Sequence, residues 1–305
     1  MDISIHILET SEEFANVEEL QRRLSPGNEA DIVPIHLLIA AVQAGGLVLG
    51  AYVGRPPLEN QVLAGFVFSF PGLYHSPGGL RPMHCSHAFG VHPGYRRNEL
   101  GFLLKRAQWQ MVRHQGIDRI VWTCDPLDSQ EAELAFSRLG AVCSSYLRDY
   151  FGPAKHTQPY GLPTDCFQVD WWLNSQRVYR RLSRRARRVL DLAHYFDAGA
   201  KIINPSLVGR SRLPHPNSTS VQDLINSATA HPSLTLPDKL LLVEIPASLA
   251  ELAAADLALA IAWRQHTRTL FETLFTRGYM VTDFIHLSGR DSRCFYVLSH
   301  AESTL

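Results

Sequence analysis

The sequence has few cysteines, no excess of either charge and no uninterrupted apolar run of membrane-spanning length. Its 305 residues hold 29 Lys and Arg against 29 Asp and Glu, which gives a formal net charge of zero. A balanced charge provides no global attraction to nucleic acid or to an anionic membrane. The apolar fraction of 46% is that of an ordinary globular protein, and the length suits one large domain or two modest ones.

Cysteine usage excludes two further classes of protein. The five cysteines are odd in number, widely separated and never arranged as C-x-x-C: Cys85, Cys124, Cys143, Cys166 and Cys294. Neither a disulfide framework nor a cysteine zinc site is indicated, and a reducing compartment fits best. The first residues lack a basic segment followed by an apolar core, so we expect no secretory signal and a cytoplasmic protein.

The first half of the chain alternates between strand and helix patterns. We expect strands at 3–8, 47–53, 64–70, 83–91, 119–124, 142–150 and 166–173, and helices at 11–24 (Ser11 as cap), 34–43, 99–115 and 129–139. The apolar stretch 35–54 is broken by Gly45 and Gly46, so a glycine-capped helix followed by a strand explains it better than a membrane span. This order predicts an α+β fold with a mixed sheet flanked by helices.

The second half begins with a basic segment. Residues 174–197 have a helical pattern with seven arginines: Arg177, Arg180, Arg181, Arg184, Arg185, Arg187 and Arg188. The charges are spread around the helix, so a solvated or inter-domain helix is favoured over a nucleic-acid surface. Turn-forming residues at 205–220 indicate an exposed connection.

A smaller α+β domain is expected at the end of the chain. Its pattern predicts strands at 239–245, 280–287 and 293–299 and one helix at 249–277. The expected division is a domain at 1–173, a basic helix and linker at 174–220, and a domain at 221–305. The final β-α-β-β order loosely resembles half of the first domain, but no internal repeat is evident.

The segment from Val91 to Gly101 carries the main functional signal. It runs from a strand end through a Pro-Gly turn with two arginines into a helix, and helix N-termini bind anions through their unpaired N–H groups. The segment resembles the acyl-CoA signature of the GNAT superfamily of N-acyltransferases: Arg or Gln, two residues, Gly, one residue, then Gly or Ala. Arg96 and Gly101 match the ends of that signature, whereas Glu99 replaces its first glycine.

Glu99 has two interpretations. A carboxylate beside a pyrophosphate raises the electrostatic energy, and its side chain hinders close approach of the backbone. Alternatively, it complements the positive end of its own helix.

Residues 122–140 resemble the family's next strand and helix. Family members often carry an Asn that contacts the cofactor and a Tyr that acts as general acid; this chain has Ser129 and Phe136. Residues 161–165 and the following Trp171 and Trp172 are similar to a subgroup of predicted acetyltransferases with a C-terminal extension.

The resemblance implies a GNAT-like fold and an N-acyltransferase. Such an enzyme moves an acetyl or other short acyl group from acetyl-CoA or another acyl-CoA to the primary amine of a small molecule by direct attack. Backbone N–H groups at a bulge near residues 89–91 would polarise the thioester. The implied cofactor-binding residues are Phe89, Val91, Arg96, Arg97, Asn98, Gly101, Ser129 and Phe136.

Candidates for proton transfer come from three places. His84 and His87 lie three apart on one strand and face opposite sides, so at most one lines a cleft and no H-x-x-H metal site is expected. Asp125 ends a strand, where ligands gather in open sheets, although it equally suits a turn before Pro126. Among Tyr146, Tyr150 and Tyr160, we take Tyr150 as the acid.

Several alternatives stay open. Arg264 and Arg268, one helical turn apart, either hold an anion or pair with acidic residues, for which Glu244, Asp256, Glu272 and Asp283 are candidates. Asp165 either receives an amine or shapes a turn. The C-terminal domain either walls the acceptor site or forms a homodimer contact. The rival functions are a non-catalytic acyl-CoA-binding module and a nucleic-acid-binding protein.

Overall fold

The computed structural model describes residues 2–26, 29–55, 61–152, 161–183, 190–208, 213–219, 239–289 and 292–300. Its internal contacts group the chain into two compact units. Unit 1 comprises Met1–Trp122 and Trp171–Leu182, and unit 2 comprises Thr123–Asp170 and Ser183–Leu305. This grouping by contacts differs from the expected division into 1–173, 174–220 and 221–305, and that division stays a prediction.

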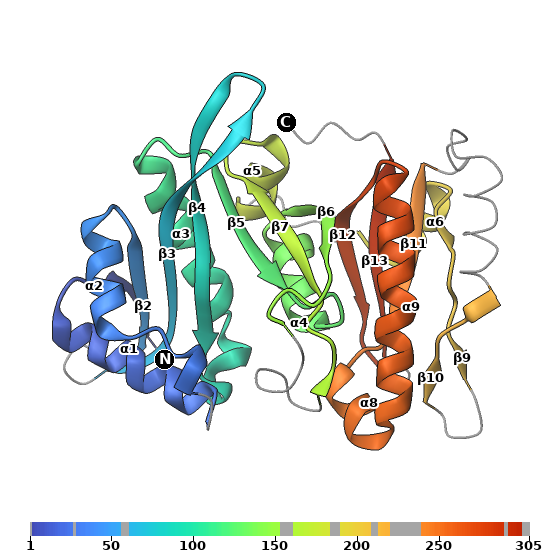
Figure 1. The fold of residues 1–305 in the computed structure, drawn as a ribbon, viewed down its shortest axis with the longest axis horizontal. Helices are drawn as coiled ribbons and strands as arrows, with labels where there is room; N and C mark the ends of the chain where they lie inside the picture. The colour runs from blue at the N-terminus through green and yellow to red at the C-terminus, as the bar shows by residue number, and fades with distance from the viewer. Residues whose placement is uncertain are drawn as a thin grey trace. The chain divides into compact units, whose positions relative to one another are not determined.

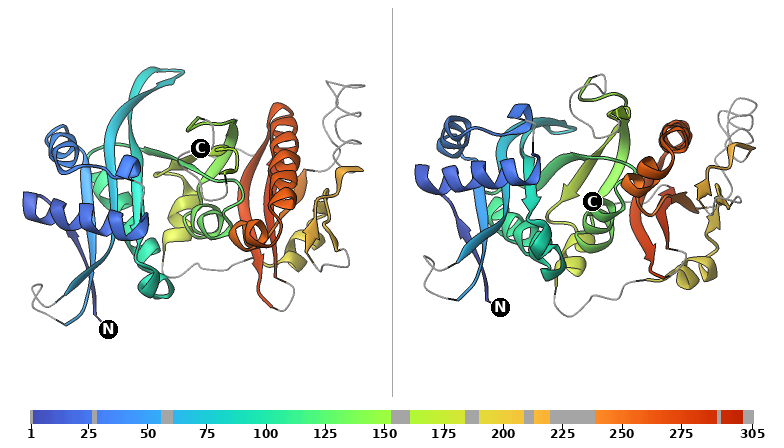
Figure 2. Two further views of the ribbon diagram at one scale, coloured as in Figure 1. Left: turned by 60° about the horizontal axis from the view of Figure 1, so that its bottom comes forward. Right: turned by 90° about the horizontal axis from the view of Figure 1, so that it is seen from below.

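Unit 1 is built on a mixed sheet. Its strands follow one another in chain order as β1 (Ile3–Ile7), β2 (Leu47–Val53), β3 (Val62–Ser76), β4 (Gly79–Val91) and β5 (Arg119–Cys124). The pairs are antiparallel except for the parallel pair of β4 and β5. Figures 1 and 2 show α1 (Ser11–Leu24) and α2 (Ile35–Gln43) on one face of this sheet and α3 (Leu100–His114) on the other.

The first helix shows how local sequence starts an element. Thr10, and not Ser11 as expected, is the N-cap of α1, and Thr10 and Glu13 form a capping box. The helix then buries Phe14, Val17 and Leu20 in a core that includes β2 and β3 residues such as Phe66. The expected cap was wrong by one residue.

The β3–β4 hairpin is longer than predicted. Its ladder continues to Ser76 and Gly79 and includes Pro71 and Pro82, although proline is uncommon inside paired strands. A proline is accommodated in a strand where its missing N–H is not required by the ladder.

Unit 2 contains a second strand series. Its strands lie in the order β7 (Cys166–Trp172), β6 (Val142–Leu147), β12 (Tyr279–Leu287), β13 (Arg293–His300), β11 (Leu240–Ile245) and β8 (Lys201–Ile202). A separate short pair joins β9 (Leu207–Val208) and β10 (Pro214–His215). The described helices are α4 (Ser129–Ala132), the π-helical η4 (Glu133–Arg138), α6 (Leu192–Asp197), α8 (Leu249–Ala255) and α9 (Leu257–Thr276).

Two long helices expected from the pattern are interrupted. The helix at 249–277 divides at Asp256, whose carboxylate caps α9 by accepting from the Leu259 N–H. The basic helix at 174–197 is wrong as one element, because α5 (Gln176–Leu182) ends before α6, which Asp191 caps. Arg184, Arg185, Arg187 and Arg188 lie outside the described residues. In each case an aspartate cap begins the helix after the break, because its side chain accepts from an N–H group of the first turn.

The α+β fold class is confirmed, with a mixed sheet flanked by helices and a further C-terminal α+β region. Among the helices of the described residues, none combines the length and apolarity needed to cross a bilayer.

Candidate functional site

In unit 1, β4 and β5 separate shortly after they pair. Their parallel ladder joins His84 to Ile120 and Cys85 to Val121, and no further pair between them occurs in the described residues. Beyond Cys85, β4 continues to Val91, and β3 is its strand partner there within the described part of the chain. One edge of a strand paired on a single side presents backbone N–H and C=O groups that an extended ligand can use.

A β-bulge lies at the start of this separated segment. Phe68 pairs with Ala88 and Ser69 pairs with Ser86, so His87 is the additional residue in β4. The bulge was expected at 89–91, but Phe89 and Val91 are regularly paired with β3. The sequence could not locate it, because a bulge is set by the register with the neighbouring strand.

His87 and His84 occupy different environments, as expected from their spacing. The His87 side chain is exposed, with its ring 5.9 Å from that of Phe68 and 5.8 Å from that of Phe70. Desolvation lowers the pKa of His87, which favours its neutral, proton-accepting form at neutral pH. His84 is fully buried, and its Nδ1 lies 3.1 Å from the Ser69 hydroxyl.

The buried His84 gives a pH-dependent contribution to stability. Burial, opposed by the Gln115 side chain, lowers its pKa to about 4. Between pH 6.5 and 4 the unfolded chain therefore binds more protons here than the folded chain, so stability falls as the pH falls. The unfolding free energy of the wild-type protein should fall between pH 7 and pH 5. In His84→Gln we expect this fall to be smaller by about 2 kcal/mol.

Urea unfolding at the two pH values measures this difference. The exposed His114→Gln serves as the matched control and should keep the wild-type pH dependence. If the unfolding free energy of His84→Gln depended on pH as in the wild type, His84 would not be held in its neutral form by the folded protein.

Lys105 lies between the two separated strands and was missed by sequence reasoning. The side chain is buried, and its Nζ is 4.4 Å from the Trp122 ring of β5 and 5.4 Å from the Phe89 ring of β4. It also donates to the Ser86 hydroxyl at 2.8 Å. The available signal was a lysine beside buried Leu104 on the apolar side of the helix.

The turn η3 (Pro93–Asn98) connects β4 to α3. His92 accepts from the Gly94 N–H at 3.2 Å, and the chain then reaches Glu99, which has a φ of +58°. Within the described residues, the Leu103 N–H donates to the Glu99 carbonyl, and this bond lies in the opening turn of α3. Gly101 lies in this opening turn, whereas the side chains of Arg96, Arg97 and Asn98 are outside the described part.

Glu99 therefore occupies a left-handed position that favours glycine. Its side chain is exposed and makes no capping bond to α3. The signature's glycine thus has a local conformational reason, because this turn requires a positive φ at that position.

In unit 2, Asp125 is held by a buried arginine. Both Arg264 terminal nitrogens donate to the two Asp125 oxygens at 2.6 Å, and the Leu127 N–H donates to Oδ1 at 2.7 Å. The Arg264 side chain is 0% exposed and that of Asp125 is 19% exposed. Burial disfavours the charged guanidinium, but the carboxylate raises the pKa of Arg264 above its usual value.

A second ion pair from α9 holds Asp165. Arg268 donates to both Asp165 oxygens at 2.7 and 2.6 Å, and the Tyr146 hydroxyl donates at 2.8 Å. Although burial favours the neutral acid, these donors lower the pKa of Asp165. The pairing interpretation of Arg264 and Arg268 is confirmed, but with Asp125 and Asp165 and not with the four acids expected.

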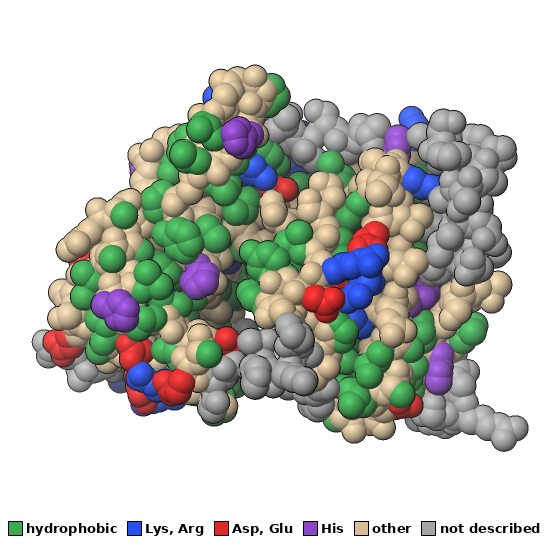
Figure 3. All heavy atoms as spheres, viewed as in Figure 1, with side chains coloured by type: hydrophobic (Ala, Val, Ile, Leu, Met, Phe, Trp, Pro, Cys, Tyr) green, Lys and Arg blue, Asp and Glu red, His purple; other side chains and the backbone are tan. Residues whose placement is uncertain are grey.

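The remaining charges beside α9 form a surface group. Arg148 donates to both oxygens of Glu272 at 2.5 Å, and Asp149 lies 3.5 Å from Arg268. Figure 3 shows these basic and acidic side chains gathered beside α9. These side chains therefore pair with one another at the surface.

Other expected site residues of unit 2 are placed as follows. The Ser129 hydroxyl donates to the Ala247 carbonyl at 2.6 Å. Phe136 is fully buried against Phe167 and Tyr296. Tyr150 is 53% exposed and stacks edge-on to Phe151, and Tyr160 lies outside the described residues.

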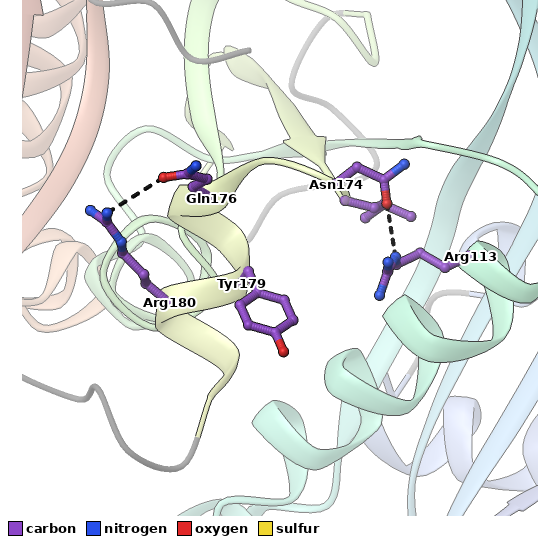
Figure 4. A pocket seen from close by; sticks show the side chains of 6 residues that line it. Arg113, Asn174, Gln176, Tyr179 and Arg180 are labelled. Carbon is purple, nitrogen blue, oxygen red and sulfur yellow. Dashed lines mark hydrogen bonds between the residues drawn. The ribbon is translucent and has the colours of Figure 1, made fainter.

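Unit 1 also has a polar pocket at the far end of α3. It is lined by Arg113, Leu173, Asn174, Gln176, Tyr179 and Arg180. Figure 4 shows the Arg113 side chain directed at Asn174 and that of Arg180 at Gln176, with distances of 2.9 and 3.4 Å. These bonds join polar groups of the pocket to one another. For metals, the described residues contain no suitable group of three His, Cys, Asp or Glu side chains.

Comparison with known proteins identifies similarity in structure alone. No family model and no curated protein matches the sequence. An Arabidopsis thaliana NAA60 structure in complex with acetyl-CoA is 16% identical, covers 57% of this chain and 99% of its own, and has a TM-score of 0.46. A putative acetyltransferase, yncA, from Salmonella typhimurium with acetyl-CoA is 19% identical, with coverages of 56% and 94% and a TM-score of 0.43. An acetyltransferase of the GNAT family from Streptococcus pneumoniae is 15% identical, with coverages of 55% and 98% and a TM-score of 0.42.

Proposed function

We propose that this chain is an N-acyltransferase that moves an acetyl or other short acyl group from acyl-CoA to the primary amine of a small molecule. One observation carries the proposal: parallel strands β4 and β5 separate after Cys85, and the free edge of β4 leads directly into the turn that opens α3. An elongated ligand with an anionic end fits this pairing of strand edge and helix N-terminus.

The two ends of acyl-CoA have distinct partners in this arrangement. The pyrophosphate would bind the amides that open α3, with Arg96 and Arg97 on the preceding turn. The extended arm would follow the edge of β4 from Ser86 to Val91 and bring the thioester near the bulge. The β4 N–H groups would polarise the thioester carbonyl.

His87 is the base that this arrangement favours. The reaction forms an N–C bond between amine and acyl carbon, breaks the C–S bond, removes a proton from the amine and delivers one to the thiolate. His87 is exposed at the bulge, and its lowered pKa keeps it neutral and able to accept that proton. Tyr150 remains our candidate for the acid.

A silent acyl-CoA-binding module is the second candidate function. Its support is that Arg264 occupies both oxygens of Asp125 and that a fully buried Phe136 replaces the family's tyrosine. Nucleic-acid binding has no comparable support from the described residues.

Release of free thiol from acetyl-CoA separates the two candidates. The intact protein would be incubated with acetyl-CoA and a panel of amino acids, polyamines and aminoglycosides. We expect at least one amine to raise thiol release well above the amine-free rate. No release with any amine, from a protein that binds acetyl-CoA, would favour the silent module.

Glu99→Gly is expected to improve both cofactor binding and stability. Repulsion between the Glu99 carboxylate and the pyrophosphate costs about 1 kcal/mol, so its removal should lower the acetyl-CoA Kd roughly fivefold. Relief of the left-handed backbone adds about 1 kcal/mol of stability and raises Tm by about 2 °C. Calorimetric titration and thermal unfolding measure the two effects.

Glu99→Gln is the matched variant, because it removes the charge and keeps the side chain. It should gain affinity without the gain in Tm. Weaker acetyl-CoA binding by both variants would mean that Glu99 contacts the ligand favourably.

A further inference from the structure

Unit 2 contains two series of elements in the same order, with longer helices in the second. The first series is the end of β5, then α4 with η4, then β6 and β7; the second is β11, then α8 with α9, then β12 and β13. In the order β7-β6-β12-β13 the two hairpins adjoin edge to edge in one sheet, and Cys143 of β6 pairs antiparallel with Val281 of β12. Antiparallel pairing of equivalent strands is the arrangement of an isologous, twofold interface.

The segment that leads into each hairpin has the same local design. Phe136-Ser137-Arg138-Leu139-Gly140 precedes β6, and Phe275-Thr276-Arg277-Gly278 precedes β12. The two glycines have φ values of +72° and +80°. The first series has one extra residue, and its helix is π-helical there, with the Leu139 N–H bonded to the Leu134 carbonyl. A π-bulge is how a helix accommodates a one-residue insertion.

The hairpins also have the same irregularity. In β6 the register with β7 shifts between Cys143 and Ser145, and in β12 the register with β13 shifts between Val281 and Asp283. The extra residues, Ser144 and Thr282, each follow the residue that forms the β6–β12 pair. Bulges at matching positions define which residues of the two series are equivalent.

The aromatic contacts between the series are reciprocal. Tyr146 pairs with Phe167 in the first hairpin and Phe284 with Tyr296 in the second, so Phe167 corresponds to Tyr296. Phe136 of the first series contacts Tyr296, with centroids 5.7 Å apart. Phe275 of the second contacts Phe167, also at 5.7 Å.

The ion pairs between the series follow the same rule. Glu272 of the second series pairs with Arg148 of the first. Their counterparts are Glu133, three residues before Phe136, and His286, two residues after Phe284, and these pair at 3.3 Å. In a twofold arrangement, each contact between the two copies occurs twice, with the roles of the copies exchanged. The two ion pairs have this relation.

We propose that residues 240–300 are a second copy of the unit at 123–170 and act as its built-in twofold partner. The edge of β6 and the adjoining helical face of the first copy thus form an interface for a second copy, and residues 240–300 of the same chain provide that second copy. The strand–turn–helix of β4 and α3 is not repeated in the described residues, and Ile245-Pro246 replaces Asp125-Pro126. On the proposed function, the second copy is therefore a partner without its own acyl-CoA site.

A hydroxyl placed by symmetry tests the twofold relation. The buried Tyr296 hydroxyl donates to the Pro126 carbonyl at 2.9 Å. If the relation holds, a tyrosine at Phe167 reaches the carbonyl of Pro246, the counterpart of Pro126. Phe167→Tyr should then change Tm by less than about 1 °C, because the new hydroxyl is satisfied.

Phe295→Tyr is the matched control, since Phe295 is equally buried but lies in an apolar cluster. An unsatisfied buried hydroxyl there should lower Tm by about 3 °C or more. A loss in Phe167→Tyr as large as that in Phe295→Tyr overturns the proposal. If Phe167→Tyr does not fold, the surface substitution His286→Arg decides.

His286→Arg copies Arg148 into the equivalent place. It should raise Tm by about 1 °C in the wild-type background and not in Glu133→Gln, because the gain requires the carboxylate. No gain, or the same gain in both backgrounds, counts against the twofold. These readouts involve no acyl-CoA, so their failure leaves the proposed function intact.

Discussion

Asp125→Asn is expected to lower Tm by about 6 to 10 °C, because it leaves the guanidinium of Arg264 buried beside a neutral amide. The Arg264 side chain is 0% exposed and gives both terminal nitrogens to Asp125 at 2.6 Å. Removing one partner of a buried pair costs about 3 to 5 kcal/mol, far more than losing a surface pair. Thermal unfolding of the single variant measures this loss.

The double variant Asp125→Asn with Arg264→Met is its control. Replacing the orphaned cation with an apolar side chain should recover much of the lost Tm, since no uncompensated charge remains. If Asp125→Asn alone kept the wild-type Tm but released no thiol, Asp125 would be the base and not a structural partner of Arg264. The structure predicts the opposite pattern: lost stability, with activity retained by the protein that stays folded.

His87→Gln is expected to lower kcat for thiol release by about 100-fold or more while leaving the acetyl-CoA Kd unchanged. A base in the ternary complex contributes to the reaction step and not to the binding of pyrophosphate. The wild-type rate should stay level from pH 8 to below pH 6.5 and fall at lower pH, because the pKa of His87 is lowered and protonation removes the base.

The exposed His36→Gln provides the same chemical change on α2 and should retain the wild-type rate and pH profile. A wild-type kcat in His87→Gln would exclude this histidine as the base. A raised Kd with unchanged kcat would instead make His87 a binding residue.

Local signals predicted much of the fold. β2 and β5 begin and end at the residues expected, since each is a continuous apolar run between turn signals. The capping box of Thr10 and Glu13 is also a local T-x-x-E pattern, although the expected cap was Ser11. By contrast, the bulge at His87 depends on the register with β3, which no local pattern specifies.

The candidate site was harder to predict where it depends on distant contacts. Asp125 suits the end of a strand, but its partner Arg264 follows 139 residues later and only the fold brings them together. Lys105 was equally hard to predict. Its burial is explained by the Trp122 and Phe89 rings beside it, which only the fold brings close to the helix. The order of elements indicated the proposed repeat only loosely, because the helices of the two series differ in length and the first series is π-helical before its glycine.

The central claim is that the amides opening α3 and the free edge of β4 hold acyl-CoA. Calorimetric titration of the intact chain with acetyl-CoA tests it most directly. We predict saturable binding of one molecule per chain, weaker at high salt because the pyrophosphate contacts are electrostatic. Absence of binding up to millimolar acetyl-CoA, in a folded protein at low salt, would contradict the account.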